Sequence, residues 1–227
     1  MEKGIKAFQC VEWVSKRKVP HTIDIVDPDP SWPATFAQLA TGIRAALPAT
    51  VIHAVHHVGS TCVPGLAAKD VIDIDLIVAD PADEASYVPA LEAAGYHFLF
   101  REPPWYEHRL FALYAPVFVN LHIYGPGELD LESARHRLLC DWLRKCPADR
   151  DLYARVKRES SEKAKAKGEG VGEYTEYKGA TIREILARAA ADAAAAGQGR
   201  EETVEAGRAE TVEAGRAETA EAGTGIE

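Results

Sequence analysis

Residues 57–78 read HVGSTCVPGLAAKDVIDIDLIV and join a glycine-serine turn to a strand that carries two aspartates. Because side chains alternate along a strand, Asp73 and Asp75 project to the same face. The opposite face is apolar and consists of Ile72, Ile74, Leu76 and Val78. Two carboxylates roughly 6 Å apart repel by about 3 kcal/mol at an effective dielectric of 20. A bound cation would relieve that repulsion, so we expect both aspartates to be catalytic and to bind metal.

The turn at residues 59–61 has the composition of a phosphate-binding loop. Glycine lets a backbone approach a phosphate closely, and the hydroxyl groups of Ser60 and Thr61 add donors beside exposed backbone N–H groups. Mg²⁺ prefers oxygen ligands and usually binds through one or two carboxylates together with substrate phosphates. We therefore expect Gly59, Ser60 and Thr61 to hold phosphate and the aspartates to hold Mg²⁺. The alternative is a solvated strand face, which is the commoner role of an Asp-x-Asp pattern.

The composition is that of a globular protein of one or two domains, because 227 residues with 47% hydrophobic content can bury a sizeable core. No run approaches about 18 consecutive apolar residues, and residues 1–21 carry scattered charges rather than a basic start and an apolar core. We expect no export, no membrane span and a cytoplasmic location. The four cysteines form no CxxC pair, so they indicate neither a zinc ribbon nor a disulfide scaffold.

The formal net charge of −9 argues against a general nucleic-acid coat, which would need a basic face to replace counterions at phosphates. A small phosphorylated ligand or a nucleotide remains open as a partner. Residues 199–227 hold three arginines and eight glutamates, so this tail carries −5 of the charge and the remaining chain −4. The part that precedes the tail is therefore only mildly acidic.

The tail repeats an octapeptide, as GREETVEA, GRAETVEA and GRAETAEA. Eight residues match neither a heptad nor a whole number of helical turns, and each copy offers little apolar surface to offset the entropy of ordering. We therefore predict an acidic, disordered tail over residues 197–227. The alternative is an extension of the preceding helix, sustained by alanine and glutamate and weakened by the glycines.

Upstream of the tail, helical and strand periods alternate, which favours an α/β or α+β layer arrangement. A helix is expected to begin near Ser31, with Pro33 in its first turn, and to end at Pro48. Strands are predicted at 51–58, 71–78, 96–100, 109–114 and 117–124. Further helices are predicted at 83–94, 131–145, 149–167 and 174–195, so the C-terminal third is helical.

The order of a Gly-Ser turn, a short helix and a strand with two spaced aspartates resembles the polymerase-β-like nucleotidyltransferase superfamily. The longer stretch from His57 to Lys69, followed by Val-Ile-Asp-Ile at 71–74, is more specific and resembles the GrpB family, also called UPF0157. The resemblance spans roughly residues 22–190 and implies a nucleotidyltransferase-like mixed sheet flanked by helices. The domains are then an extension at 1–21, a GrpB-like domain at 22–196 and the tail.

The resemblance implies Mg²⁺-dependent transfer of a nucleotidyl group from a nucleoside triphosphate to an unknown acceptor, with Lys69 binding phosphate and offsetting developing charge. Active members of the superfamily use a third carboxylate on a later strand, whereas the matching strand here carries Asn120 and His122. Neither supplies the negative charge that a two-metal site needs. Glu102 and Glu107 are the nearby acids that could replace it. Two alternatives stay open: a non-catalytic module that binds a nucleotide or phosphorylated metabolite, and a protein-interaction domain.

Further polar side chains near the motif are candidates for substrate contact, namely His57, His122, Asn120, Arg109 and Lys178. Cations among them could meet a triphosphate, although most surface cations are merely solvated. The histidines also admit a zinc site, which strand alternation weakens because His56 takes the face opposite to His53 and His57. A nucleophilic Cys62 is weaker still, because no orienting partner is evident.

Overall fold

The computed structural model describes residues 11–20 and 22–221, with side chains described up to residue 196. The chain divides after Leu186 into two compact units. The first unit contains the whole β-sheet and the candidate site. The second unit begins at Ala187, and its described residues are helical.

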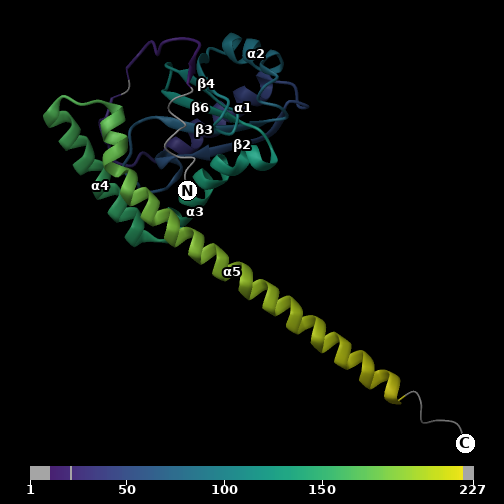
Figure 1. Ribbon diagram of the computed structural model, residues 1–227. Coiled ribbons are helices and arrows are strands. Elements are labelled where there is room, and N and C mark those ends of the chain that lie inside the picture. The colour runs from purple at the N-terminus through teal and green to yellow at the C-terminus, as the bar shows by residue number, and fades with distance from the viewer. Residues whose placement is uncertain (1–10, 21, 222–227) are drawn as a thin grey trace, which may run out of the picture. The chain divides into compact units, whose positions relative to one another are not determined.

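A mixed sheet of six strands forms the centre of the first unit (Figure 1). The strands are β1 (Glu12–Trp13), β2 (Ile52–Val58), β3 (Ile72–Val78), β4 (His97–Glu102), β5 (His108–Leu113) and β6 (Val119–Tyr124). Their order in the sheet is β1-β4-β5-β6-β3-β2. Neighbours are antiparallel except for β3 and β6, which run parallel. The predicted α+β class with a mixed sheet is therefore confirmed.

Five α-helices lie in the described part of the chain. They are α1 (Trp32–Ala46), α2 (Val88–Ala93), α3 (Leu131–Lys145), α4 (Pro147–Lys167) and α5 (Val171–Glu221). Proline occupies the first turn of α1, α2 and α4, where its missing N–H breaks no helical hydrogen bond. The helix predicted over 83–94 is interrupted, because a short 3₁₀ turn at Glu84–Ser86 precedes α2.

Strand β3 separates an apolar core from a polar layer. The side chains of its apolar face are at most 2% exposed and pack with those of α1 and α2; they are Ile72, Ile74, Leu76 and Val78. A second cluster joins Val58 at the end of β2 to buried residues of α3, α4 and the start of α5. Asp75 faces α3, where it contacts His136, and alternation along the strand puts Asp73 on the same face of β3. The candidate site lies in this polar layer.

Helix α5 continues through the octapeptide repeats to Glu221. The backbone over 197–221 is therefore helical. A helical extension is the alternative that the sequence left open beside a disordered tail. Alanine, glutamate and arginine are among the best helix formers, and they offset a cost of about 1 kcal/mol at each glycine. Residues 222–227 lie outside the described part of the chain. None of the described helices combines the length and the apolar character that crossing a membrane requires.

The segment predicted as an N-terminal extension contributes to the sheet where it is described, over residues 11–20. Strand β1 pairs antiparallel with β4, and Trp13 packs edge-on against Phe100 with ring centres 5.1 Å apart. Two residues are too few to produce a strand pattern, so β1 could not be predicted. Residues 1–10 and 21 lie outside the described residues.

Candidate functional site

The glycine-serine turn meets the first aspartate of β3 directly. Val58 at the end of β2 pairs with Asp73, so the next residue begins beside the carboxylate. Gly59 has a φ of +69°, and a Cβ built on it would lie 2.3 Å from Asp73 Oδ2. That distance is far inside van der Waals contact, and a positive φ disfavours other residues in any case. Glycine is therefore required for this close approach.

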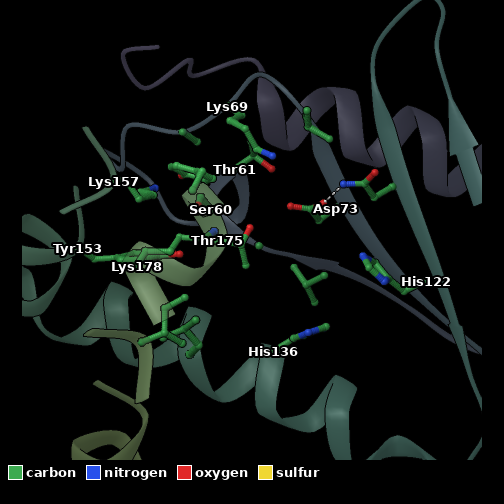
Figure 2. Close-up of a pocket in the computed structure, with 18 of the residues that line it drawn as sticks. Ser60, Thr61, Lys69, Asp73, His122, His136, Tyr153, Lys157, Thr175 and Lys178 are labelled. Carbon is green, nitrogen blue, oxygen red and sulfur yellow. Dashed lines mark hydrogen bonds between the residues drawn. The ribbon is translucent and has the colours of Figure 1, made fainter. Parts of the chain in front are cut away.

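A cavity of about 390 Å³ opens beside the turn (Figure 2). Most of the residues expected at the site line it, namely Gly59, Ser60, Thr61, Lys69, Asp73, Asn120, His122 and Lys178. Three expected residues do not line it, namely Asp75, His57 and Arg109. Among the described residues that line the cavity, Asp73 is the one carboxylate. In Figure 2 the labelled lysines lie on one side of the cavity and His122 lies on the other.

Three lysines and two tyrosines form the basic wall of the cavity. Lys69 Nζ and Lys178 Nζ lie 5.7 and 4.9 Å from the centre of the Tyr174 ring. Lys157 Nζ lies 4.7 Å from the centre of the Tyr153 ring. Cations are attracted to the faces of aromatic rings, so the two tyrosines hold the three ammonium groups near one another.

Lys157 is the most deeply buried of the three lysines. It is 1% exposed, and its Nζ donates a hydrogen bond to the Ala67 carbonyl oxygen. Burial, and then the charges of Lys178 and Arg158, lower its pKa well below the usual value. No carboxylate of the described residues forms an ion pair with it. An anion in the cavity would supply the missing counterion.

The other two lysines differ in their electrostatics. Burial opposes the charge of Lys178, but the oxygens of Tyr153 and Tyr174 and the carboxylate of Asp73 outweigh it and raise its pKa. The pKa of Lys69 is lowered, because burial and two neighbouring cations outweigh the attraction of Asp73. Lys178 is therefore the firmest positive charge in the basic wall.

Asp73 is anchored by the strand beside it. Its Oδ1 accepts a hydrogen bond of 2.8 Å from Asn120 Nδ2, and the two residues are Cα partners in the parallel β3–β6 pair. Asn120 Oδ1 in turn accepts a hydrogen bond of 3.1 Å from Arg17 Nη2. A residue of the N-terminal segment therefore reaches the edge of the site. Asn120 fixes the carboxylate and does not replace a third acid.

Asp75 does not line the cavity, contrary to expectation. It is fully buried, and its Oδ2 lies 3.0 Å from His136 Nδ1 on α3. The second nitrogen of His136 lies 3.4 Å from Glu132 Oε1. Burial alone would lower the pKa of His136, but the two carboxylates raise it to about 10, so the ring is an imidazolium. The positive charge beside Asp75 comes from this histidine.

In this arrangement Asp75 is already paired with His136, so Asp73 is the aspartate of the motif that lines the cavity. A cation bound by both aspartates would compete with His136 for the Asp75 carboxylate. Among the described residues, no group of three or more histidines, cysteines, aspartates and glutamates is placed to hold a metal ion. This also leaves the zinc interpretation without support. Cys62, the weak candidate nucleophile, is a free buried thiol packed in the second core cluster.

His57 and Arg109 take structural positions instead of contacting the cavity. His57 Nε2 lies 3.0 Å from Thr61 Oγ1, and its ring stacks on Phe36 with centres 4.6 Å apart. Burial lowers the pKa of His57 to about 4, so the ring is neutral. Its contact with Thr61 stabilises the turn from the side away from the cavity. Arg109 is 4% exposed and pairs with Glu84 Oε1 at 3.1 Å and Glu107 Oε2 at 2.6 Å.

The helices supply site residues that the sequence motif did not reveal. Arg135 and His136 come from α3, Lys157 from α4 and Thr175 from α5. Lys157 carried one signal, because it lies four residues after the buried Tyr153 on the inward face of α4. A lysine on an apolar helix face is unusual and could have marked it as a candidate.

The fold and the site together define an α+β protein with a mixed sheet and a basic cavity beside a glycine-serine turn. The model of the GrpB protein family matches residues 22–188, and the chain belongs to that family. A UPF0157 protein of Halalkalibacterium halodurans is 43% identical over 173 residues, which cover 75% of this chain and 85% of the relative. The GrpB resemblance stated from residues 57–74 is therefore confirmed.

Two further proteins are similar to this chain. The crystal structure of a conserved GrpB protein from Enterococcus faecalis matches 73% of this chain and 96% of its own, with a TM-score of 0.61 and 26% identity. A dephospho-CoA kinase of Mycolicibacterium paratuberculosis is 32% identical over 167 residues, which cover 63% of this chain and 40% of the kinase. This chain therefore matches less than half of that kinase.

Proposed function

We propose that the cavity binds a small phosphorylated ligand, held by the basic wall and by the turn at residues 59–61. The observation that carries this proposal is the convergence of Lys69, Lys157 and Lys178 on one cavity whose described lining includes a single carboxylate. Hydroxyl groups at Ser60 and Thr61 and the lysine ammonium groups are donors that suit phosphate oxygens. Asp73 is that carboxylate, and one negative charge does not neutralise three ammonium groups.

The energetic case rests on the buried ammonium groups. Like charges that line one cavity repel and opposite charges attract, and both effects grow where burial lowers the effective dielectric. A phosphate placed among the lysines therefore replaces repulsion with attraction. This favours a ligand with at least two negative charges, such as a nucleotide or another phosphorylated metabolite.

Nucleotidyl transfer is the second candidate, and one observation favours it. Asp73 lies in the cavity against the turn, where a catalytic carboxylate of the resembled superfamily is expected. The buried Asp75–His136 pair weighs against it, because the second metal ligand is then unavailable. Mg²⁺ dependence separates the two candidates. If the protein transfers a nucleotidyl group, it should release pyrophosphate from a nucleoside triphosphate in the presence of Mg²⁺. The Asp73→Asn variant should not release it.

The binding proposal is tested by isothermal titration of the protein with pyrophosphate and with ATP. Lys178→Gln should weaken binding by about 10-fold to 100-fold, since a hydrogen bond to a charged group contributes about 1.5–3 kcal/mol. Lys145→Gln is the matched control, because Lys145 is exposed and does not line the cavity. Dephospho-coenzyme A belongs in the same series, because one relative is a dephospho-CoA kinase.

Equal affinity in the Lys178 and Lys145 variants would contradict the assignment of binding to this cavity. Failure of pyrophosphate and of every nucleotide to bind the wild type would favour the third alternative, a protein-interaction domain.

A further inference from the structure

A row of three hydrogen-bonded side chains connects the cavity to the end of β4. Glu102 ends β4, His108 begins β5, and His122 lies on β6. Glu102 Oε2 lies 2.7 Å from His108 Nδ1, and His108 Nε2 lies 3.0 Å from His122 Nδ1. His122 lines the cavity, so this row of side chains ends at the cavity. Glu102, considered above as a replacement acid, is thus linked to the cavity through two histidines.

The ring geometry suits hydrogen bonds rather than loose packing. The His108 and His122 rings have centres 5.1 Å apart and planes 21° apart, so they meet nearly edge to edge. An N–H bond lies in the plane of its imidazole ring, so this arrangement aligns the donor with the acceptor. Tyr124 packs against His108 with ring centres 5.0 Å apart and holds the orientation. His108 is 5% exposed, which keeps water from competing.

The direction of the hydrogen bonds among the three side chains follows from Glu102, whose carboxylate is the acceptor at one end. A carboxylate only accepts hydrogen bonds, so a His108 ring with a single N–H carries that proton on Nδ1, facing Glu102. His108 Nε2 then carries a lone pair and accepts from His122 Nδ1–H. His122 Nε2 is left with a lone pair, and no hydrogen bond to it occurs among the described residues.

We propose that Glu102, His108 and His122 form a proton relay that removes a proton from a ligand hydroxyl group in the cavity. The hydroxyl proton passes to His122 Nε2, while the proton on His122 Nδ1 passes to His108 Nε2. His122 is neutral before and after the step. The positive charge ends on His108 beside the Glu102 carboxylate, and the negative charge stays on the ligand oxygen.

The relay explains how a weakly basic group serves as a base. Burial, and then the neighbouring His108, lower the pKa of His122 to about 4, so a proton held on His122 alone would be costly. In the relay the new charge forms where a carboxylate stabilises it. His122 would touch the ligand and is the catalytic residue, whereas Glu102 and His108 are positioning residues.

The position of His122 indicates the class of ligand, and this step rests on the proposed phosphate binding. The lysines and His122 lie on different sides of the cavity (Figure 2). A ligand that places phosphate among the lysines would present its other end to His122. The ligand is therefore a phosphorylated alcohol whose reacting hydroxyl is remote from the phosphate.

The test uses the full-length protein without ligand, labelled with ¹⁵N at histidine, and measures long-range ¹H–¹⁵N correlations of the rings. We expect His122 to be neutral with its proton on Nδ1 and an unprotonated Nε2. A proton on Nε2, or on both nitrogens, would overturn the relay. The result is independent of ligand binding, so failure of the relay and failure of the proposed function are distinguishable.

A variant separates a relay from simple packing. His108→Phe keeps a ring beside Tyr124 but removes the acceptor, so the His122 signals should shift toward a mixture of the two neutral tautomers. The exposed His53 is the internal control and should not change. Unchanged His122 signals would contradict the relay. If the variant does not fold, the tautomer of His122 in the wild type still tests the relay.

Discussion

At the scale of single residues, two kinds of contact form the cavity. Some join segments that are close in the sequence, and others join segments that are far apart in it. Gly59, Lys69 and Asp73 could be predicted as neighbours, because a turn and the next strand bring them together. The outcome for Asp75 could not be predicted. Its partner His136 lies 61 positions later, and nothing in the strand pattern announces a buried imidazolium.

Gly59→Ala should abolish binding of pyrophosphate and lower the free energy of unfolding by more than about 1–3 kcal/mol, the usual cost of a strained backbone position. The added Cβ would collide with Asp73 Oδ2. Gly65→Ala is the matched control, because Gly65 has a φ of +76° and no atom within 4 Å of an added Cβ. The control should lose some stability and keep binding. Similar losses in both variants would show that the contact with Asp73 does not matter.

Lys157→Met should weaken pyrophosphate binding at least 10-fold while raising the free energy of unfolding by about 1 kcal/mol. Burial disfavours the ammonium form of Lys157, so an apolar side chain of similar length should be more stable at this position, even though the Ala67 carbonyl loses its donor. Chemical unfolding and titration of one preparation measure both effects. A variant that is clearly less stable than the wild type would assign Lys157 a structural role.

At the scale of elements, most helices and strands could be predicted from periodicity and from proline and glycine. The prediction for 131–145 coincides with α3, and the predicted strands agree with β2 to β6 within a few residues. Strand β1 is too short to leave a pattern. The contribution of α3, α4 and α5 to the cavity could not be predicted, because their polar site residues lie within ordinary amphipathic helices. Only tertiary packing selects them.

The link between α3 and β3 should give stability a specific pH dependence. The pKa of His136 is raised from 6.5 to about 10, so its contribution is fully present below pH 6.5 and is lost as the pH rises toward 10. The difference in unfolding free energy between wild type and His136→Gln should therefore shrink over that range. Urea unfolding at pH 6, 8 and 10 measures it, with His53→Gln as the exposed control. A constant difference would mean that His136 is not charged.

At the scale of the whole molecule, the family and the mixed sheet could be predicted from residues 57–78 and their surroundings. The repeats of the tail are poor in apolar residues, which predicts disorder, whereas their alanine and glutamate content favours the helical backbone that extends to Glu221. The boundary between the two units lies after Leu186, ten residues before the predicted end of the domain.

Removal of residues 197–227 should leave pyrophosphate affinity within about twofold of the full chain and the melting temperature unchanged. The residues that line the cavity end at Ile182, inside the first unit. Titration and thermal melting of the truncated chain check both expectations. Loss of binding would contradict the placement of the site in the first unit alone.

Above all, we propose that this cavity binds a phosphorylated ligand and that the lysines of the basic wall allow it to do so without a metal. The most direct measurement is a thermal-shift series of wild-type protein in EDTA with ATP, GTP, CTP, UTP and dephospho-coenzyme A at millimolar concentration. Ligand at 100 times its Kd stabilises a protein by about 2.7 kcal/mol, so at least one compound should raise the melting temperature by several degrees. No shift in EDTA with a clear shift in Mg²⁺ would contradict the account and restore a metal-dependent site at Asp73.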